Sequence, residues 1–203
     1  MLPVRAREEI RARADRVSET AGALRVSAAT TLRAHAQSGF PARELRLYRP
    51  WYPASGSALP ERILLSVNEF RPHRFRDVVP VAVISARLEQ QVLRTDGALG
   101  IVTAYQPWGR ITYSLSLWSG EAALEEFTGS PEHVAVMNTY RSRGYLRHIH
   151  WWGRHHSIGA SMAEARRRLD AGQGRRAGAP RDEWARWDRR RLSAASAPDD
   201  SLR

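Results

Sequence analysis

The sequence contains no cysteine and no lysine among its 203 residues. Without cysteine the chain forms no disulfide, and it offers no thiolate for nucleophilic catalysis or for a metal site. It also lacks an apolar run long enough to span a bilayer, and its start carries charge where a secretory signal would be apolar. We therefore expect a cytoplasmic protein without a membrane span.

The positive charge consists entirely of arginine, and its distribution argues against a nucleic-acid partner. The net charge is +11, with an excess of +5 in residues 1–50, +2 in 51–160 and +4 in 161–203. Nucleic-acid binding usually needs a clustered basic patch on a recognisable module, whereas most of this surplus lies towards the two ends. Arginine without lysine, beside abundant alanine, indicates the codon bias of a high-GC genome.

The chain divides into one domain and two extensions. Residues 1–60 are expected to form a helical N-terminal extension, as one or two helices, followed by a Pro-rich connector. Residues 61–160 carry the apolar periodicity of a folded domain. Residues 161–203 are expected to form a short helix and a disordered basic tail, because the sequence from Gly172 onward is mostly Gly, Arg, Ala, Ser and Asp.

The central domain alternates strand and helix patterns in the order β-α-β-β-α-β. The expected strands are residues 62–70, 99–106, 110–118 and 146–152, and the expected helices are 75–95, 121–127 and 131–142. This order predicts an α+β fold of the ferredoxin-like type, with two helical segments on one sheet face. The other face also needs a cover, and a second copy of the sheet in a homodimer would supply it.

One face of the predicted sheet is unusually polar. Its alternate positions are Leu64, Ser66, Asn68 and Phe70, then Thr112, Ser114, Ser116 and Trp118, then His148, His150 and Trp152. Buried polar groups need partners, so this face would make a poor dry core. It is suited to line a cavity for a small hydrophobic molecule.

Three segments resemble the dimeric α+β barrel superfamily, in the antibiotic biosynthesis monooxygenase and spheroidene monooxygenase-like branch. The first is the segment from Tyr113 to Phe127, with a Trp at the strand end and an acidic Ala-rich helix. The second is Ser-Pro-Glu-His at 130–133, and the His-x-His-Trp-Trp strand is also similar. The resemblance implies a ferredoxin-like domain forming a dimeric α+β barrel, and an oxidoreductase of monooxygenase type acting on a small hydrophobic or aromatic secondary metabolite.

The resemblance also implies candidate catalytic residues. Cofactor-independent oxygenases of this superfamily use an Asn on the first strand and a Trp near the end of the third, and Asn68 and Trp118 occupy similar places. A general base would come from His148 or His150, which share a strand face. Two histidines alone are too few for a zinc site, and no carboxylate is near in sequence, so we predict no metal.

The cofactor is left open between none and haem. If the enzyme is haem-dependent, His133 is the first candidate ligand, because its place near a helix N-terminus favours the neutral ring, and Trp152 is a candidate to pack the porphyrin. The rival hypothesis is a non-catalytic dimeric barrel that binds a small molecule or acts as a scaffold through its Arg-rich ends.

Overall fold

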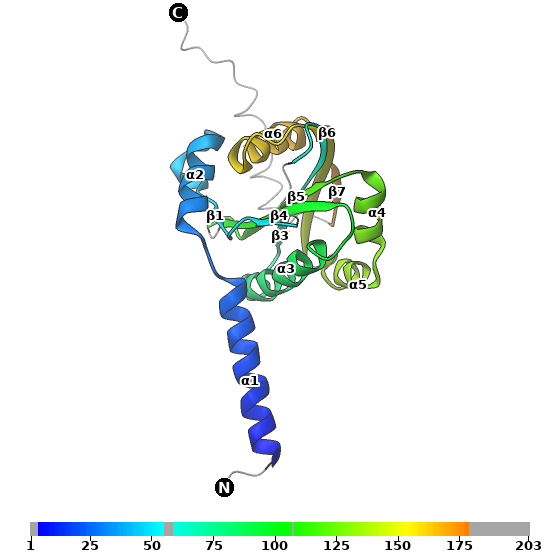
Figure 1. The fold of residues 1–203 in the computed structure, drawn as a ribbon. Helices are drawn as coiled ribbons and strands as arrows, with labels where there is room; N and C mark the ends of the chain where they lie inside the picture. Colours follow the sequence, from blue (N-terminus) through cyan, green and yellow to red (C-terminus); the bar gives the residue numbers. More distant parts are fainter. Residues whose placement is uncertain (1–3, 55–58, 107, 179–203) are drawn as a thin grey trace, which may run out of the picture.

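The structure is a computed structural model that describes residues 4–54, 59–106 and 108–178 (Figure 1). The helices are α1 (Val4–Ala23), α2 (Ala28–Ser38), α3 (Val78–Val92), α4 (Glu121–Gly129), α5 (Pro131–Tyr140) and α6 (Ile158–Asp170). The strands are β1 (Leu47–Tyr48), β2 (Tyr52–Pro53), β3 (Ile63–Pro72), β4 (Ala98–Gln106), β5 (Ile111–Trp118), β6 (Gly144–Gly153) and β7 (Arg175–Ala177). Two short 3-10 helices, Ala42–Glu44 and Phe75–Asp77, precede β1 and α3.

The strands form one antiparallel sheet in the order β1-β4-β5-β3-β6-β7, with β2 also paired to β4. Its four long strands are connected through α3 and through α4 and α5 in the predicted β-α-β-β-α-β order. The structure therefore confirms the predicted α+β, ferredoxin-like fold. The central strand β3 pairs on one side with β5 and on the other with β6, so that Asn68 lies between Ser114 and His148.

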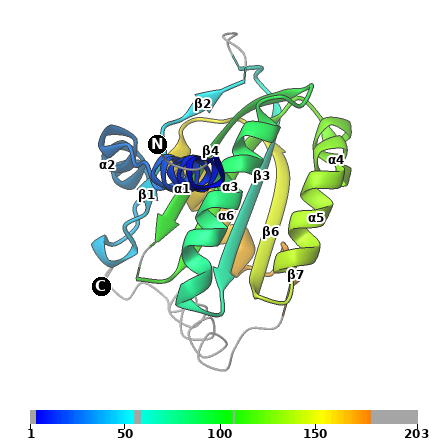
Figure 2. The same cartoon turned by 90° about the horizontal axis from the view of Figure 1, so that it is seen from below.

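Helices cover both faces of the sheet. Helices α3, α4 and α5 lie on the polar face, and α2 and α6 lie on the opposite face (Figures 1 and 2). The opposite face is apolar because residues such as Leu65, Val67 and Leu115 alternate with the polar set, and all three are buried. Met162 and Ala165 of α6 pack against this cluster, together with Ala34 of α2.

This cover differs from the expected one. From the sequence, the apolar face was expected to pack the helices of the ferredoxin-like domain, and a second copy of the chain was expected to cover the other face, because nothing later in the chain looked long or apolar enough alone. The helices α3, α4 and α5 lie on the polar face instead, which leaves the apolar face to other elements. In the structure both extensions contribute to the cover. Helix α2 comes from the N-terminal extension and α6 from the beginning of the C-terminal one, and the two helices contact each other. Covering this face therefore requires no second subunit.

A buried charge network fixes α6 to the sheet. Arg147 on β6 donates to both carboxylate oxygens of Glu69 on β3, at 3.1 and 2.8 Å, and to Asp170 at the end of α6 at 2.8 Å. Arg166 pairs with Glu44 and so joins α6 to the segment before β1. Charges removed from water need such partners, because an unpaired buried charge would cost several kcal/mol.

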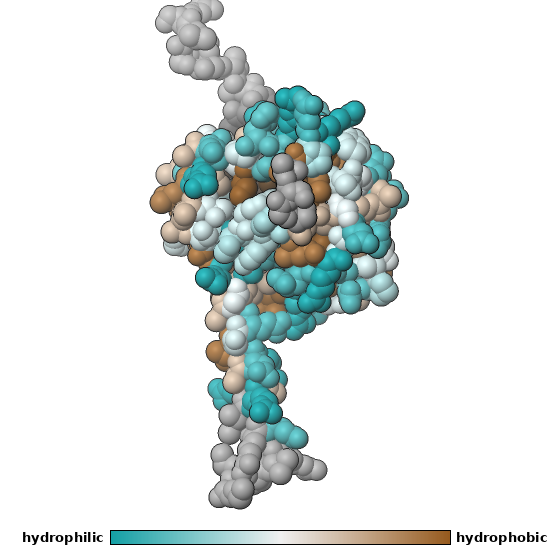
Figure 3. All heavy atoms as spheres, viewed as in Figure 1, coloured by the Kyte–Doolittle hydropathy of each residue, from teal (hydrophilic) through white to brown (hydrophobic). Residues whose placement is uncertain are grey.

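The helix α1 extends away from the body of the molecule (Figure 1). Its base is fixed by Arg49, which donates to the carbonyls of Gly22 and Ala23, both at 2.5 Å. An exposed ion pair between Glu19 and Arg87 joins it to α3. In Figure 3 the coloured part of α1 carries hydrophilic side chains together with some apolar ones near the body. Within the described ranges, no helix has an apolar stretch that could cross a membrane.

Two local features differ from the sequence-based expectations, and a third agrees with them where it is described. The connector 41–60 contains β1 and β2, both paired with β4, where an irregular segment was expected. The predicted tail begins later than Gly172, because β7 pairs with β6; its remainder, 179–203, lies outside the described residues. Of the predicted hairpin turn Pro107–Gly109, Pro107 lies outside the described residues, and Trp108 and Gly109 form a turn.

Candidate functional site

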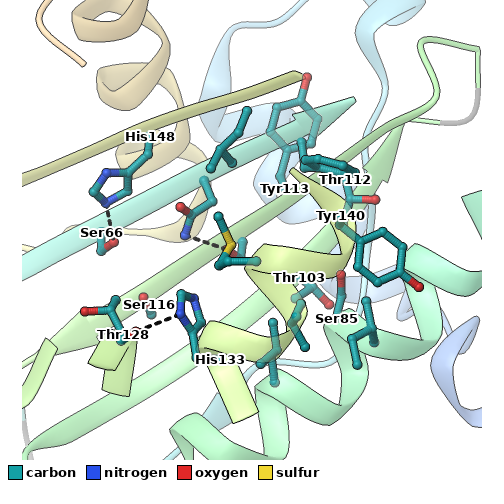
Figure 4. A pocket seen from close by; sticks show the side chains of 18 of the residues that line it. Ser66, Ser85, Thr103, Thr112, Tyr113, Ser116, Thr128, His133, Tyr140 and His148 are labelled. Atoms are coloured by element: carbon teal, nitrogen blue, oxygen red, sulfur yellow. Dashed lines mark hydrogen bonds between the residues drawn. The ribbon is translucent and has the colours of Figure 1, made fainter. Parts of the chain in front are cut away.

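A cavity of about 390 Å³ lies between the polar face of the sheet and the helices α3, α4 and α5 (Figure 4). Its volume falls near the lower end of the range for small-molecule sites, roughly 300–1,000 Å³. The sheet supplies a polar wall made by Ser66, Asn68, Thr103, Thr112, Ser114, Ser116 and His148. The helices supply an apolar wall that includes Val81, Ile84, Leu88, Val92, Leu124, Phe127, Val136 and Met137.

The polar wall consists mostly of small side chains, and some of them are held by hydrogen bonds. The Asn68 amide nitrogen donates to the Ser114 hydroxyl at 3.2 Å, and the Thr103 hydroxyl donates to the buried Glu89 carboxylate at 3.2 Å. Short Ser and Thr side chains on a pleated sheet leave the space that larger apolar residues would fill. The cavity is therefore a consequence of the polar strand pattern, as the sequence predicted.

His148 lies in this wall with an unusually low basicity. It is opposite Asn68 in the β3–β6 register, and its Nε2 atom lies 3.5 Å from the Ser66 hydroxyl. Burial lowers the pKa of His148 to about 4, and the charges of His150, Arg175 and His133 act in the same direction. At neutral pH the ring is uncharged, so it presents a nitrogen lone pair to the cavity.

His133 enters the cavity from the start of α5. The Ser130 hydroxyl caps this helix by accepting the His133 backbone N–H at 3.3 Å, and Pro131 occupies the first turn, as predicted. The His133 Nδ1 atom lies 3.0 Å from the Thr128 carbonyl, which can only accept, so Nδ1 carries the hydrogen and Nε2 keeps its lone pair. Burial lowers the pKa of His133, and the bond to Thr128 opposes that effect.

Trp118 lies behind the cavity wall instead of in it. Its side chain is fully buried and packs on Phe127, with the ring centroids 5.4 Å apart. Its indole N–H donates to the Ser116 hydroxyl at 2.9 Å, and Ser116 and Phe127 both line the cavity. Trp118 can therefore orient two residues of the cavity but does not itself line it.

His150 and Trp152 lie outside the cavity, although they share a strand face with His148. The residues of β6 that line it are Gly144, Leu146 and His148, and β6 continues beyond the cavity towards solvent. Trp152 is 39% exposed, and its indole donates to Glu121 at 3.2 Å. The alternation of side chains along β6 was predicted correctly. The sequence pattern of a strand, however, does not show how far along it the covering helices extend.

The residues predicted to hold haem are not brought together. His133 has the arrangement of a potential ligand, since one ring nitrogen bonds to a carbonyl and the other is free to coordinate. Trp152, however, is at the exposed end of β6 and cannot pack on a group bound inside the cavity. Among the described residues, no three His, Asp or Glu side chains are grouped as metal ligands.

Several cavity residues contributed by other elements were not predicted from the sequence. These are the apolar positions of α3 and the arginines Arg141, Arg175 and Arg176. A signal for α3 was present, because Val81, Leu88 and Val92 follow helical spacing. None was present for β7, whose three residues are too few to show alternation.

Comparison of the sequence with family models and with curated proteins finds no match. Among solved structures, the chain is similar to a monooxygenase candidate from Fusobacterium nucleatum, with 4% identity and a TM-score of 0.43. That match covers 54% of this chain and 48% of the other, so the chain spans about half the length of that protein.

Two further structures are similar over a shorter part of this chain. SnoaB from Streptomyces nogalater, a cofactor-independent oxygenase, has 13% identity and a TM-score of 0.39, covering 48% of this chain and 96% of its own. A protein from Mycobacterium tuberculosis has 13% identity and a TM-score of 0.38, covering 43% and 92%. These similarities concern the fold alone, because one fold carries many functions.

Proposed function

We propose that the cavity is the active site of a monooxygenase-like enzyme that oxidises a small hydrophobic, aromatic molecule. The observation that carries the proposal is the contrast between its walls. An apolar helical wall suits the rings of such a molecule. The opposite wall of Asn68, Ser66, Ser116 and a neutral His148 suits the oxygen atoms at one edge of it.

The reaction that these residues support needs a substrate whose anion reacts with oxygen itself. An enolisable ketone or phenol loses a proton, its anion transfers electrons to O₂, and a carbon–oxygen bond forms. The resulting hydroperoxide loses water and leaves a carbonyl group. The Asn68 amide and the serine hydroxyls donate hydrogen bonds to the developing oxyanions, which are stabilised more strongly in a cavity than in water.

His148 is the residue of the cavity that we assign as base, and its low pKa limits the substrate. Moving a proton from a phenol of pKa about 10 to a ring of pKa about 4 costs on the order of 8 kcal/mol, since each unit is about 1.4 kcal/mol. A turnover near 10 per second corresponds to a barrier of about 16 kcal/mol. Half of that barrier would be consumed by deprotonation, so substrates more acidic than a simple phenol are favoured.

Oxygen uptake with anthrone tests this function. Anthrone is a flat, enolisable tricyclic ketone whose CH₂ group becomes a carbonyl while O₂ supplies one oxygen to the product and one to water. We expect Asn68→Ala to slow uptake about 100-fold, as loss of an oxyanion donor does elsewhere. His148→Gln is expected to slow it as well. His150→Gln is the matched control, because it lies on the same strand outside the cavity, and it should retain full activity.

The rival function is a binding protein without turnover. It predicts that anthrone binds, that Asn68→Ala weakens binding, and that no oxygen is consumed. A haem-dependent variant rests on the free Nε2 atom of His133. It predicts a shifted Soret band with added haemin that is lost in His133→Ala, and no anthrone oxidation before haemin is added.

A further inference from the structure

The charged side chains that line the cavity are all positive in the part of the chain that the structure describes. They are Arg141, Arg175 and Arg176, and no described Asp or Glu lines the cavity. The two histidines of the wall do not add positive charge at neutral pH, because burial lowers the pKa of each. The charges that line the cavity in this part of the chain therefore have one sign, which favours a bound anion beside them.

Arg175 is placed at the cavity by the pairing of β7 with β6. It lies directly opposite His148 in that register, and directly paired residues of antiparallel strands share one face of the sheet. Arg141 follows the last turn of α5 and lines the same cavity. Both arginines are exposed at its mouth, where a ligand group entering from solvent would meet them first.

The position of β7 depends on two glycines at its ends. A side chain at Gly174 would overlap the His148 carbonyl, and one at Gly178 would overlap the Gly144 carbonyl. Gly178 also has a φ of +78°, a conformation that glycine adopts at little cost. The backbone of β7 thus approaches β6 closely at both ends, which fixes the place of Arg175.

The two arginines at the mouth differ from the other arginines around the sheet. Arg147, the neighbour of His148 on β6, is buried and paired with Glu69 and Asp170. Arg49 is buried and paired with Glu89. Within the described ranges, neither Arg141 nor Arg175 forms an ion pair. Two guanidinium groups without a counter-ion among the described residues, at the mouth of an apolar cavity, are an arrangement that binds carboxylates and phosphates.

We propose that the natural ligand is amphipathic, with a hydrophobic body inside the cavity and a carboxylate or phosphate held at the mouth by Arg175 and Arg141. This proposal rests on the cavity being the ligand site described above. It adds a defined orientation, because the anionic end fixes which edge of the ligand faces Asn68 and Ser66. The same positive field would lower the pKa of an enol or phenol on the ligand and so reduce the deprotonation cost at His148.

Calorimetric titration of the full chain with three naphthalene ligands tests the proposal. The ligands are 2-naphthoate, 2-naphthyl phosphate and the neutral 2-naphthamide, which share one ring system. We expect at least one anion to bind about tenfold to hundredfold more tightly than the amide, the range for hydrogen bonds to charged groups. The tighter of the two anions identifies the natural headgroup.

Arg175→Gln and Arg141→Gln should each remove most of the preference for the anion and leave the affinity for the amide unchanged. Arg33→Gln, an exposed arginine on α2 with the same change in charge, should keep the preference. Equal affinity for anion and amide, or equal weakening of both by Arg175→Gln, would overturn the anion site while the cavity remains. Failure of all three ligands to bind would contradict the cavity as the ligand site and this proposal with it.

Discussion

Gly159 of α6 lies directly against the backbone carbonyl of Ala34 on α2, so closely that a side chain at position 159 would overlap that oxygen. This contact joins the two helices that cover the apolar face of the sheet. It is a packing contact that only glycine allows, since the neighbouring atoms are the Ala34 oxygen, the Ser38 nitrogen and the Gln37 Cβ, none of which can rotate away.

Gly159→Ala is therefore expected to separate α2 from α6 and to lower the free energy of unfolding by about 1–3 kcal/mol, the usual cost of overpacking. Urea unfolding followed by circular dichroism measures it. Gly22→Ala is the matched control: it lies in α1 with nothing within 4 Å of an added methyl group, and it should be neutral or stabilise by up to about 1 kcal/mol. Equal stability of the two variants would show that the helices do not need this contact.

The Arg49–Glu89 ion pair provides the second prediction. The Arg49 Nε atom lies 2.8 Å from Glu89 Oε2, and the Glu89 side chain is 0% exposed. Burial raises the pKa of Glu89, and the charge of Arg49 opposes this effect. Glu89→Gln leaves the guanidinium without its counter-charge and should cost about 3–5 kcal/mol.

The double variant Arg49→Met with Glu89→Leu removes both charges, and we expect it to unfold at a higher urea concentration than Glu89→Gln. A double variant less stable than Glu89→Gln would mean that the hydrogen bonds of Arg49 to Gly22 and Ala23 matter more than the ion pair.

His148 makes stability depend on pH. Its pKa is about 4 in the folded chain and about 6.5 in the unfolded one, so the unfolded state binds more protons between these values. Stability should thus be complete above pH 6.5 and fall as the pH decreases towards 4, by on the order of 3 kcal/mol. Thermal unfolding of His148→Gln should show a shallower fall over that window. His35→Gln on α2, which covers the opposite face of the sheet, is the control and should follow the parent protein.

Trp118 is expected to act on the site through Ser116. Trp118→Phe keeps an aromatic ring beside Phe127 but removes the indole N–H that Ser116 accepts. We expect weaker ligand binding and a stability loss of about 1 kcal/mol, the net value of one hydrogen bond. Trp152→Phe removes an indole hydrogen bond to Glu121 that is exposed to water, so it should leave ligand binding unchanged and cost less stability than Trp118→Phe. Unchanged ligand affinity in Trp118→Phe would make the residue purely structural.

The strands and helices of the central domain could be predicted because their residues alternate or repeat with clear periods. The polar face, with Asn68 and His148, was predicted for the same reason, and its residues line the cavity. Tertiary packing limited what could be predicted about the site. His148 lies inside the cavity and His150 outside it because of where the helices lie over the polar face. Strand periodicity contains no information about the position of those helices.

The covering helices were harder to predict because each is weakly apolar by itself. Helix α2 contributes only Ala34 to the core cluster, and the stripe of α6, which includes Met162, Ala165 and Leu169, is narrow and interrupted by charged residues. Their burial arises from close mutual approach at Gly159. The strand β7 was missed because its sequence, Arg-Arg-Ala, has no strand preference, and backbone pairing with β6 alone determines it.

The cover formed by α2 and α6 also has a consequence for the order of folding. These helices lie at opposite ends of the described chain, and the sheet that they enclose is encoded between them. During synthesis, α2 and most strands emerge while the apolar face still lacks α6. That face is then open to unintended association until residues 158–170 have left the ribosome. The long sequence separation between α2 and α6 also predicts slow, late closure, which makes this chain a candidate for chaperone assistance during synthesis.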